Sequence, residues 1–185
     1  MMFSEQRVAQ MAAYLLGQEK GRMNYLKLIK LLYLADRASM KRHGHPISGD
    51  RYVSMDHGPV LSQTFNFIKG AAKSAEHGWN YWIADQADYA VSLKRKATRE
   101  SLDALSEANI DVLDSVHTKF GKMDQWKLVD YVHRYCKEWQ DPNGSSIPID
   151  YEEIFKALGR TASEAKKLGK RVEQQRSIDR LFASL

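Results

Sequence analysis

Residues 24–44, NYLKLIKLLYLADRASMKRHG, constrain the fold of this 185-residue chain more than any other segment. Asn24 suits a helix N-cap and Gly44 suits a helix stop, and the residues between them are apolar on almost every side. A helix that is apolar nearly all round must be surrounded by other elements, so we expect this one at the centre of the core. One narrow polar stripe remains, formed by Lys27, Lys30, Arg37 and Lys41.

Asp36 lies on the opposite side of this helix from the polar stripe, so its carboxylate is predicted to point inward. A buried carboxylate is costly unless it has a hydrogen-bond or charge partner. The segment that follows, HPISGDRYVSMDHGPV at residues 45–60, can supply one. We expect the partner to be Arg51, His57 or backbone N–H groups of this segment.

Residues 45–60 contain two prolines, two glycines, two aspartates, two histidines and an arginine. Within them, RYVSM at 51–55 predicts a short strand. The Gly58–Pro59 pair predicts the start of a helix running to Ala71, because proline suits the first helical position.

Apolar spacing and cap residues predict helices over residues 4–18, 106–121, 124–139, 150–159 and 161–185. Capping-box patterns begin the last two, Asp150 with Glu153 and Thr161 with Glu164.

WNYWI and YAVSL predict a hairpin pairing residues 79–83 with 89–93, which must lie on helices or pair with a further strand. The fold class is therefore mainly α, a compact multi-helix domain with a small β-hairpin or short sheet. We expect this domain to span residues 1–159, followed by a basic C-terminal helical extension at 160–185.

Charge and cysteine content narrow the function classes. Residues 1–155 contain 20 Lys+Arg and 20 Asp+Glu, whereas residues 156–185 contain 8 and 3, so the net charge of +5 comes from the C-terminal segment. The body therefore has no net attraction for nucleic acid. A single cysteine, Cys136, allows no intrachain disulfide, and no targeting or membrane-spanning run is present, so we expect a cytoplasmic protein.

Catalytic signatures such as GxSxG, HExxH, GxGxxG, a P-loop or paired CxxC are absent, so we predict no enzyme activity and no cofactor. Cys136 lies in a helix pattern and is predicted to be buried. Five residues have a spacing that could hold a transition metal: His43, His45, Asp50, Asp56 and His57. Histidines at a helix C-terminus and aspartates in turns have ordinary structural roles, so we predict no metal site.

The C-terminal extension admits three interpretations: contact with nucleic acid or an anionic membrane face, docking to a partner, or capping of its own domain or of a homodimer mate. It lacks interleaved aromatic and arginine residues, which favours docking over nucleic acid. The candidate partner-binding residues in it are Lys170, Arg171, Ile178, Leu181 and Phe182.

KLIKLLYLAD followed by GHPISGDRYVSMDHGPV resembles the Panacea domain of SocA-like antitoxins and phage-associated proteins. The helix motif matches at Lys27, Leu28, Lys30, Leu31, Leu32, Tyr33, Ala35 and Asp36. The loop motif matches at Gly44, Pro46, Ile47, Gly49, Asp50, Tyr52, His57, Gly58, Pro59 and Val60. A weaker resemblance continues through FGKMDQWKLVDYVH to Trp139, with RYCKE where the family has an acidic residue and a proline, so the whole covers about residues 5–140.

The resemblance implies a bacterial or phage antitoxin that neutralises a cognate protein toxin by direct binding. Alternatives are an adaptor that delivers a toxin to a AAA+ protease, and a nucleic-acid binder acting through the basic extension. The motif residues with a structural or partner-binding role would be Lys27, Lys30, Tyr33, Asp36, Asp50, Arg51, Tyr52, His57, Gly58 and Pro59. We expect them to be mainly scaffold, with toxin specificity in the extension and in exposed parts of the hairpin region.

Overall fold

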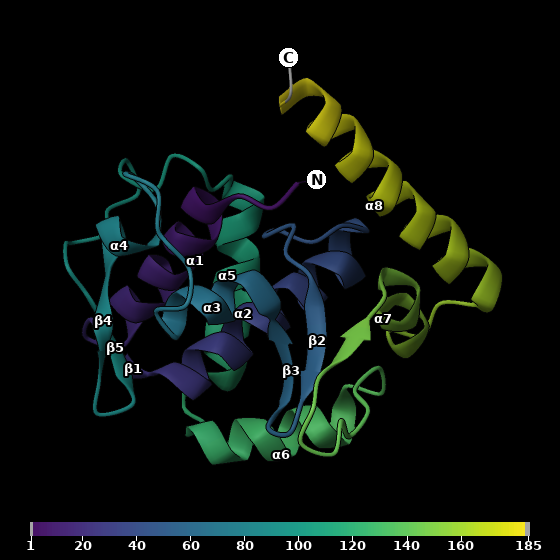
Figure 1. Cartoon of the computed structure of the whole chain (residues 1–185), viewed down its shortest axis with the longest axis horizontal. Coiled ribbons are helices and arrows are strands. Elements are labelled where there is room, and N and C mark those ends of the chain that lie inside the picture. The colour runs from purple at the N-terminus through teal and green to yellow at the C-terminus, as the bar shows by residue number, and fades with distance from the viewer. Residues whose placement is uncertain (1, 184–185) are drawn as a thin grey trace.

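The computed structural model describes residues 2–183 and is mainly helical, as predicted (Figure 1). Its helices are α1 (Glu5–Gln18), α2 (Tyr25–His43), α3 (Ser62–Ile68), α4 (Trp79–Trp82), α5 (Glu107–Phe120), α6 (Gln125–Tyr135), α7 (Tyr151–Ala157) and α8 (Ala162–Ala183). Its strands are β1 (Arg22–Asn24), β2 (Tyr52–Met55), β3 (Gly58–Leu61), β4 (Ile83–Ala87), β5 (Ala90–Leu93) and β6 (Ile147–Ile149). The helix predicted over 161–185 is confirmed as far as Ala183, and Met1 and residues 184–185 lie outside the described part.

Side-chain caps set the starts of helices α1, α2, α5, α6 and α8. Helix α2 begins after Asn24, whose side chain accepts a hydrogen bond from the Leu26 N–H, and ends at Gly44 with φ +78°. The capping box of Thr161 and Glu164 is confirmed. Asp150 precedes α7 but makes no side-chain capping bond, so the box predicted there is wrong. Helix α6 also ends earlier than predicted, at Tyr135.

The β structure is more extensive than the small hairpin or short sheet predicted. The described strands form two three-stranded sheets, in the orders β1-β5-β4 and β3-β2-β6. In the first, the hairpin turns at Asp88 and Tyr89, and β1 pairs with β5. The segment Trp79–Trp82, predicted as a strand, is the single helical turn α4, because two tryptophans three positions apart are both buried on one side of it.

The second sheet corrects the helix start predicted at Pro59. Gly58 has φ +95° and pairs with Met55 across a two-residue turn, so the chain continues as strand β3 rather than as a helix. Pro59 is tolerated because β3 is an edge strand of this sheet. Helix α3 begins only at Ser62.

Helix α2 lies at the centre of the core, as predicted, and contacts α1, α5, α6 and strand β3. Its apolar side chains are buried along its length. The predicted polar stripe is wrong at Lys30, which is fully buried. Strand β3 and helix α6 cover that side of α2, which local periodicity could not reveal.

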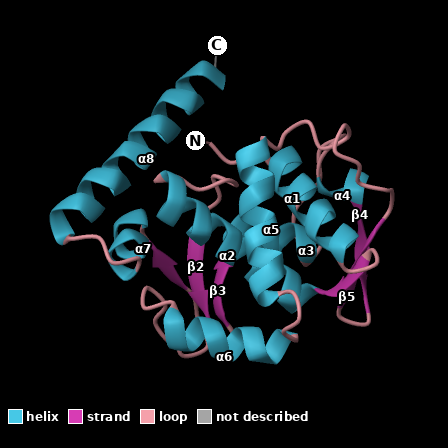
Figure 2. Ribbon diagram, turned by 180° about the vertical axis from the view of Figure 1, so that it is seen from behind, coloured by secondary structure: helices cyan, strands magenta, loops and turns pink. Residues whose placement is uncertain are grey.

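Helix α8 runs along one side of the molecule, and its C-terminal end lies near the N-terminus of the chain (Figures 1 and 2). Its first half packs on α7, and Ala165 and Val172 are buried there. Near its other end, the Asp179 carboxylate accepts a hydrogen bond from the Met2 N–H at 2.8 Å. None of the described helices combines the length and apolar character needed to span a lipid bilayer.

Candidate functional site

Asp36 is the acceptor that holds the segment 45–60 against α2. Its buried carboxylate accepts hydrogen bonds from the Ile47 N–H at 2.8 Å, the Ser48 N–H at 2.9 Å and the Tyr52 hydroxyl at 2.9 Å, and also from the Ser48 hydroxyl. Burial raises the pKa of Asp36, and these hydrogen bonds act in the opposite direction. The predicted inward orientation is confirmed, with backbone N–H groups and hydroxyls as partners in place of Arg51 or His57.

Asp50, the second motif aspartate, ties the same segment to the start of α3. Its carboxylate accepts from the N–H groups of Gln63 at 3.0 Å and Thr64 at 2.9 Å, and from the Thr64 hydroxyl at 2.7 Å. These are donors that a helix N-terminus leaves unpaired, so a buried carboxylate is stable there. Both motif aspartates therefore use their oxygens inside the fold.

The β2–β3 hairpin packs closely on α2 and α6. The contacts involve Lys30, Gly58 and Pro59. The Lys30 ammonium donates to the Pro59 carbonyl oxygen at 2.9 Å, and burial lowers the pKa of Lys30 to about 7. A Cβ on Gly58 would lie 2.5 Å from a Val132 methyl group, so a larger side chain does not fit without movement of α6. This part of the motif also has an internal structural role.

The β2–β3 hairpin also contacts the aromatic pair of His133 and Trp139. Their rings stack with centroids 4.0 Å apart, and the Trp139 indole N–H donates to the Met55 carbonyl oxygen at 2.9 Å. The His133 Nε2 has no hydrogen-bond partner within the described residues. The stack gives His133 a packing role despite the departure of RYCKE from the family pattern.

Glu138 is a structural residue that the sequence analysis missed. Its buried carboxylate accepts from the Tyr33 hydroxyl at 2.5 Å and from Arg37 Nε at 2.6 Å. Tyr33 and Arg37 are four positions apart on α2, so both reach the segment after α6. The spacing of Tyr33 and Arg37 on a largely apolar helix was the sequence signal that could have indicated a shared polar partner.

Lys27 of the motif also has an internal partner, because its ammonium group donates to the Gly121 carbonyl oxygen at 2.6 Å.

The other candidate side chains are dispersed. His43 and His45 stack on each other with centroids 6.1 Å apart, whereas Asp56 accepts from the Gly144 N–H. Within residues 2–183, no group of three or more His, Cys, Asp or Glu side chains is arranged to hold a metal ion. Cys136 is buried as predicted, and burial raises its pKa to about 12.

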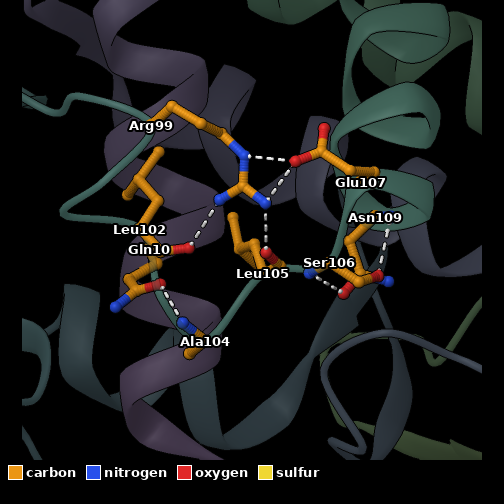
Figure 3. A network of polar contacts seen from close by, with 8 residues as sticks. All are labelled: Gln10, Arg99, Leu102, Ala104, Leu105, Ser106, Glu107 and Asn109. Carbon is orange, nitrogen blue, oxygen red and sulfur yellow. Dashed lines mark hydrogen bonds and ion pairs between the residues drawn. The ribbon is translucent and has the colours of Figure 1, made fainter.

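The basic loop after β5 is held to the body by polar contacts (Figure 3). Arg99 donates to two backbone carbonyl oxygens of the loop and pairs with Glu107 at 2.7 Å. Buried Gln10 accepts from the Ala104 N–H at 2.8 Å. Arg99 is therefore engaged within the protein.

Among the motif residues, Arg51 and His57 remain exposed. His57 packs edge-on against Trp126, and Tyr25 stacks on Tyr89 nearby. These four rings line a hollow of about 370 Å³ that joins the motif to the hairpin region. The exposed side chains of the motif are thus Arg51 and, at the β2–β3 turn, His57.

The far end of α8 is the second exposed surface. Ile178, Leu181 and Phe182 are 47%, 63% and 70% exposed. Lys170 and Arg171 are exposed nearer the middle of the same helix. The other large exposed apolar side chains in the described part are Met2, Tyr89, Trp126 and Tyr135. Clustered apolar side chains on a surface mark candidate interaction sites.

Comparison with known proteins gives one finding. A family described as antitoxin SocA-like, Panacea domain, matches residues 28–140, which includes the motif from Lys30 to Pro59. Helices α7 and α8 lie outside the matched range. No curated protein and no solved structure matches the chain.

Proposed function

The chain belongs to the family of SocA-like antitoxins with a Panacea domain, and on this premise we propose that it neutralises a cognate protein toxin by binding it directly. The family match over residues 28–140 carries this proposal, since it indicates a role related to toxin–antitoxin systems. The proposed site of action is the cytoplasm, where the toxin would be made.

Binding rather than catalysis is proposed because the buried carboxylates and the buried amine of the motif already have partners inside the fold. Asp36 and Asp50 accept hydrogen bonds from the surrounding chain, and Lys30 is buried against Pro59. The Cys136 thiol is buried, and its raised pKa keeps it protonated. These residues stabilise a scaffold on which exposed surfaces are presented.

The proposed contact surface is the far end of α8. Ile178 and Phe182 are four positions apart, so both lie on one face of the helix. Burying an exposed aliphatic or aromatic side chain contributes about 1.5–3 kcal/mol. Contact through this face would hold a toxin in a stable complex by occlusion or by locking its conformation.

The test is co-expression of the tagged protein with the protein encoded beside it, followed by capture and growth assays. Wild type should restore growth and capture a stoichiometric partner that is toxic alone. Failure to capture any toxic neighbour would contradict the antitoxin proposal. A partner that is captured only transiently, and whose half-life shortens, would support the alternative of an adaptor for a AAA+ protease.

The contact surface has its own test in the double variant Ile178→Ser/Phe182→Ser. It should fold normally and bind the toxin at least about tenfold more weakly, since two apolar contacts are lost. The matched control is Tyr135→Ser, which removes an exposed aromatic side chain from α6 and should retain protection. If the α8 variant still protects cells, the toxin binds elsewhere.

A further inference from the structure

Three arginines reach one hollow of about 300 Å³ beside the second sheet. Arg51 comes from the motif, and Arg176 and Arg180 come from α8. The carboxylate-bearing residues Asp150 and Glu173 also line the hollow, so acidic groups are outnumbered there. The hollow is therefore lined both by the family motif and by α8, a helix outside the range 28–140 that the family matches.

Arg176 is built into the floor of this hollow. It is only 8% exposed, and its Nη1 donates to the Tyr151 hydroxyl at 3.2 Å while the guanidinium lies over the Tyr151 ring at 5.7 Å. Its Nε has no hydrogen-bond partner among residues 2–183, and its ion pair with Glu173 is long at 3.9 Å. A buried guanidinium with an unused donor is costly unless an acceptor fills the space beside it.

Tyr151 fixes the orientation of Arg176. Its hydroxyl accepts from Arg176 and donates to the Asp50 carbonyl oxygen at 3.2 Å. Burial raises the pKa of Tyr151, so the hydroxyl keeps the proton that it donates. The arginine is therefore held in place by the same loop that Asp36 and Asp50 anchor.

Arg51 and Arg180 are exposed, and no carboxylate in the described part of the chain pairs with either of them. The hollow is lined by three arginines and only two carboxylate-bearing residues, Asp150 and Glu173, so its net charge favours binding of an anion. Guanidinium groups bind phosphate and carboxylate groups through paired N–H donors.

We propose that this hollow binds an oxyanion, a phosphate or carboxylate group held by Arg51, Arg176 and Arg180. The oxyanion has two possible sources: a free phosphate ion, or an acidic side chain of a bound protein. The second source rests on the proposed function. In that case Arg51 of the motif and the two arginines of α8 would bind one acidic residue of the toxin.

The test is isothermal titration calorimetry of the full chain with inorganic phosphate at constant ionic strength. Arg51→Gln/Arg180→Gln removes two exposed guanidiniums from the hollow. The matched control Lys166→Gln/Lys167→Gln removes two exposed charges from α8 outside it. Wild type and control should bind with the same Kd, and the hollow variant at least about tenfold more weakly. The proposal is overturned if phosphate shows no saturable binding to the wild-type chain, or if the hollow variant and the control variant bind phosphate with the same Kd.

A parallel titration with N-acetylglutamate separates the two sources. Phosphate binding more than tenfold tighter than N-acetylglutamate supports a free phosphate ion. Comparable affinities that both depend on Arg51 and Arg180 support an acidic side chain of a partner. Because no toxin is present in either titration, a failure here leaves the antitoxin proposal standing, and a failed capture experiment leaves the hollow standing.

Discussion

At the scale of single residues, the Asp36 carboxylate organises the loop around itself. Asn at this position would present an NH₂ group to donors from Ser48 and Tyr52, leaving them unpaired in a buried site. We expect Asp36→Asn to lower the free energy of unfolding by about 2–4 kcal/mol in urea denaturation. The control is the exposed Asp111→Asn, expected to change it by less than about 0.5 kcal/mol. Equal midpoints would show that the carboxylate charge is unimportant.

Lys30 makes stability depend on pH. Burial lowers its pKa from 10.5 to about 7 in the folded protein. Between these values the unfolded chain holds a proton that the folded chain has released, so the free energy of unfolding rises with pH. The slope from this one group approaches about 1.4 kcal/mol per pH unit and vanishes below the folded pKa.

Chemical denaturation of wild type and Lys30→Met at several pH values between 6 and 10 measures this contribution. The difference in unfolding free energy should shift in favour of wild type as pH rises. Lys41→Met, which removes an exposed lysine from the same helix, should follow the wild-type curve. Parallel curves for wild type and Lys30→Met would mean that Lys30 titrates normally in the folded state.

At the scale of elements, the β2–β3 hairpin depends on glycine at position 58. Alanine there must adopt φ +95° and places its Cβ 2.5 Å from Val132. We expect Gly58→Ala to lower the free energy of unfolding by about 2–4 kcal/mol. Gly70→Ala has φ +68° with open space around it, so it isolates the backbone cost of about 1–2 kcal/mol. Urea midpoints that coincide for the two variants would show that the contact with α6 relaxes.

The helix boundaries that were predicted correctly have local signals. Asn24, Gly44 and Thr161 act on backbone groups within four residues, so sequence alone locates those ends. The start predicted at Pro59 failed because a positive φ at Gly58 and pairing with β2 outweighed the preference of proline for a helix start. Pairing partners such as β6 are distant in the chain and leave no local pattern.

The candidate site was predictable in part for the same reason. The inward direction of Asp36 follows from helical period, and its partners follow in the next segment. The burial of Lys30 and the contacts of Glu138 depend on how α6 and the segment after it pack on α2. The hollow around Arg176 requires α8 to lie beside the motif, which no spacing in the sequence encodes.

At the scale of the whole molecule, charge and packing give different divisions of the chain. Residues 1–155 are neutral in formal charge and the remainder carries the excess, which sets α8 apart. Packing joins α8 to the body, because Ala165, Val172 and Arg176 are buried against it. The division into residues 1–159 and 160–185 therefore stays a prediction that truncation can test.

Truncation after Gly159 should destabilise what remains, because it removes the helix that packs on α7. Loss of that packing costs about 3 kcal/mol, which corresponds to a fall in Tm of roughly 6–12 °C. Truncation after Ser177 removes the exposed end of α8 together with the hydrogen bond between Asp179 and Met2, and should change Tm by less than about 2 °C. Thermal unfolding followed by circular dichroism compares both with the full chain.

The two truncations also separate folding from partner binding. A chain ending at Ser177 keeps Arg176 on Tyr151 but lacks Ile178 and Phe182, so it should be stable and fail to capture the toxin. If truncation after Gly159 leaves Tm unchanged, α8 adds no stability and residues 160–185 are an independent extension. Helix α8 provides one wall of the hollow lined by Arg51, Arg176 and Arg180. If α8 added no stability, this hollow would form only when a bound partner holds the helix against the body.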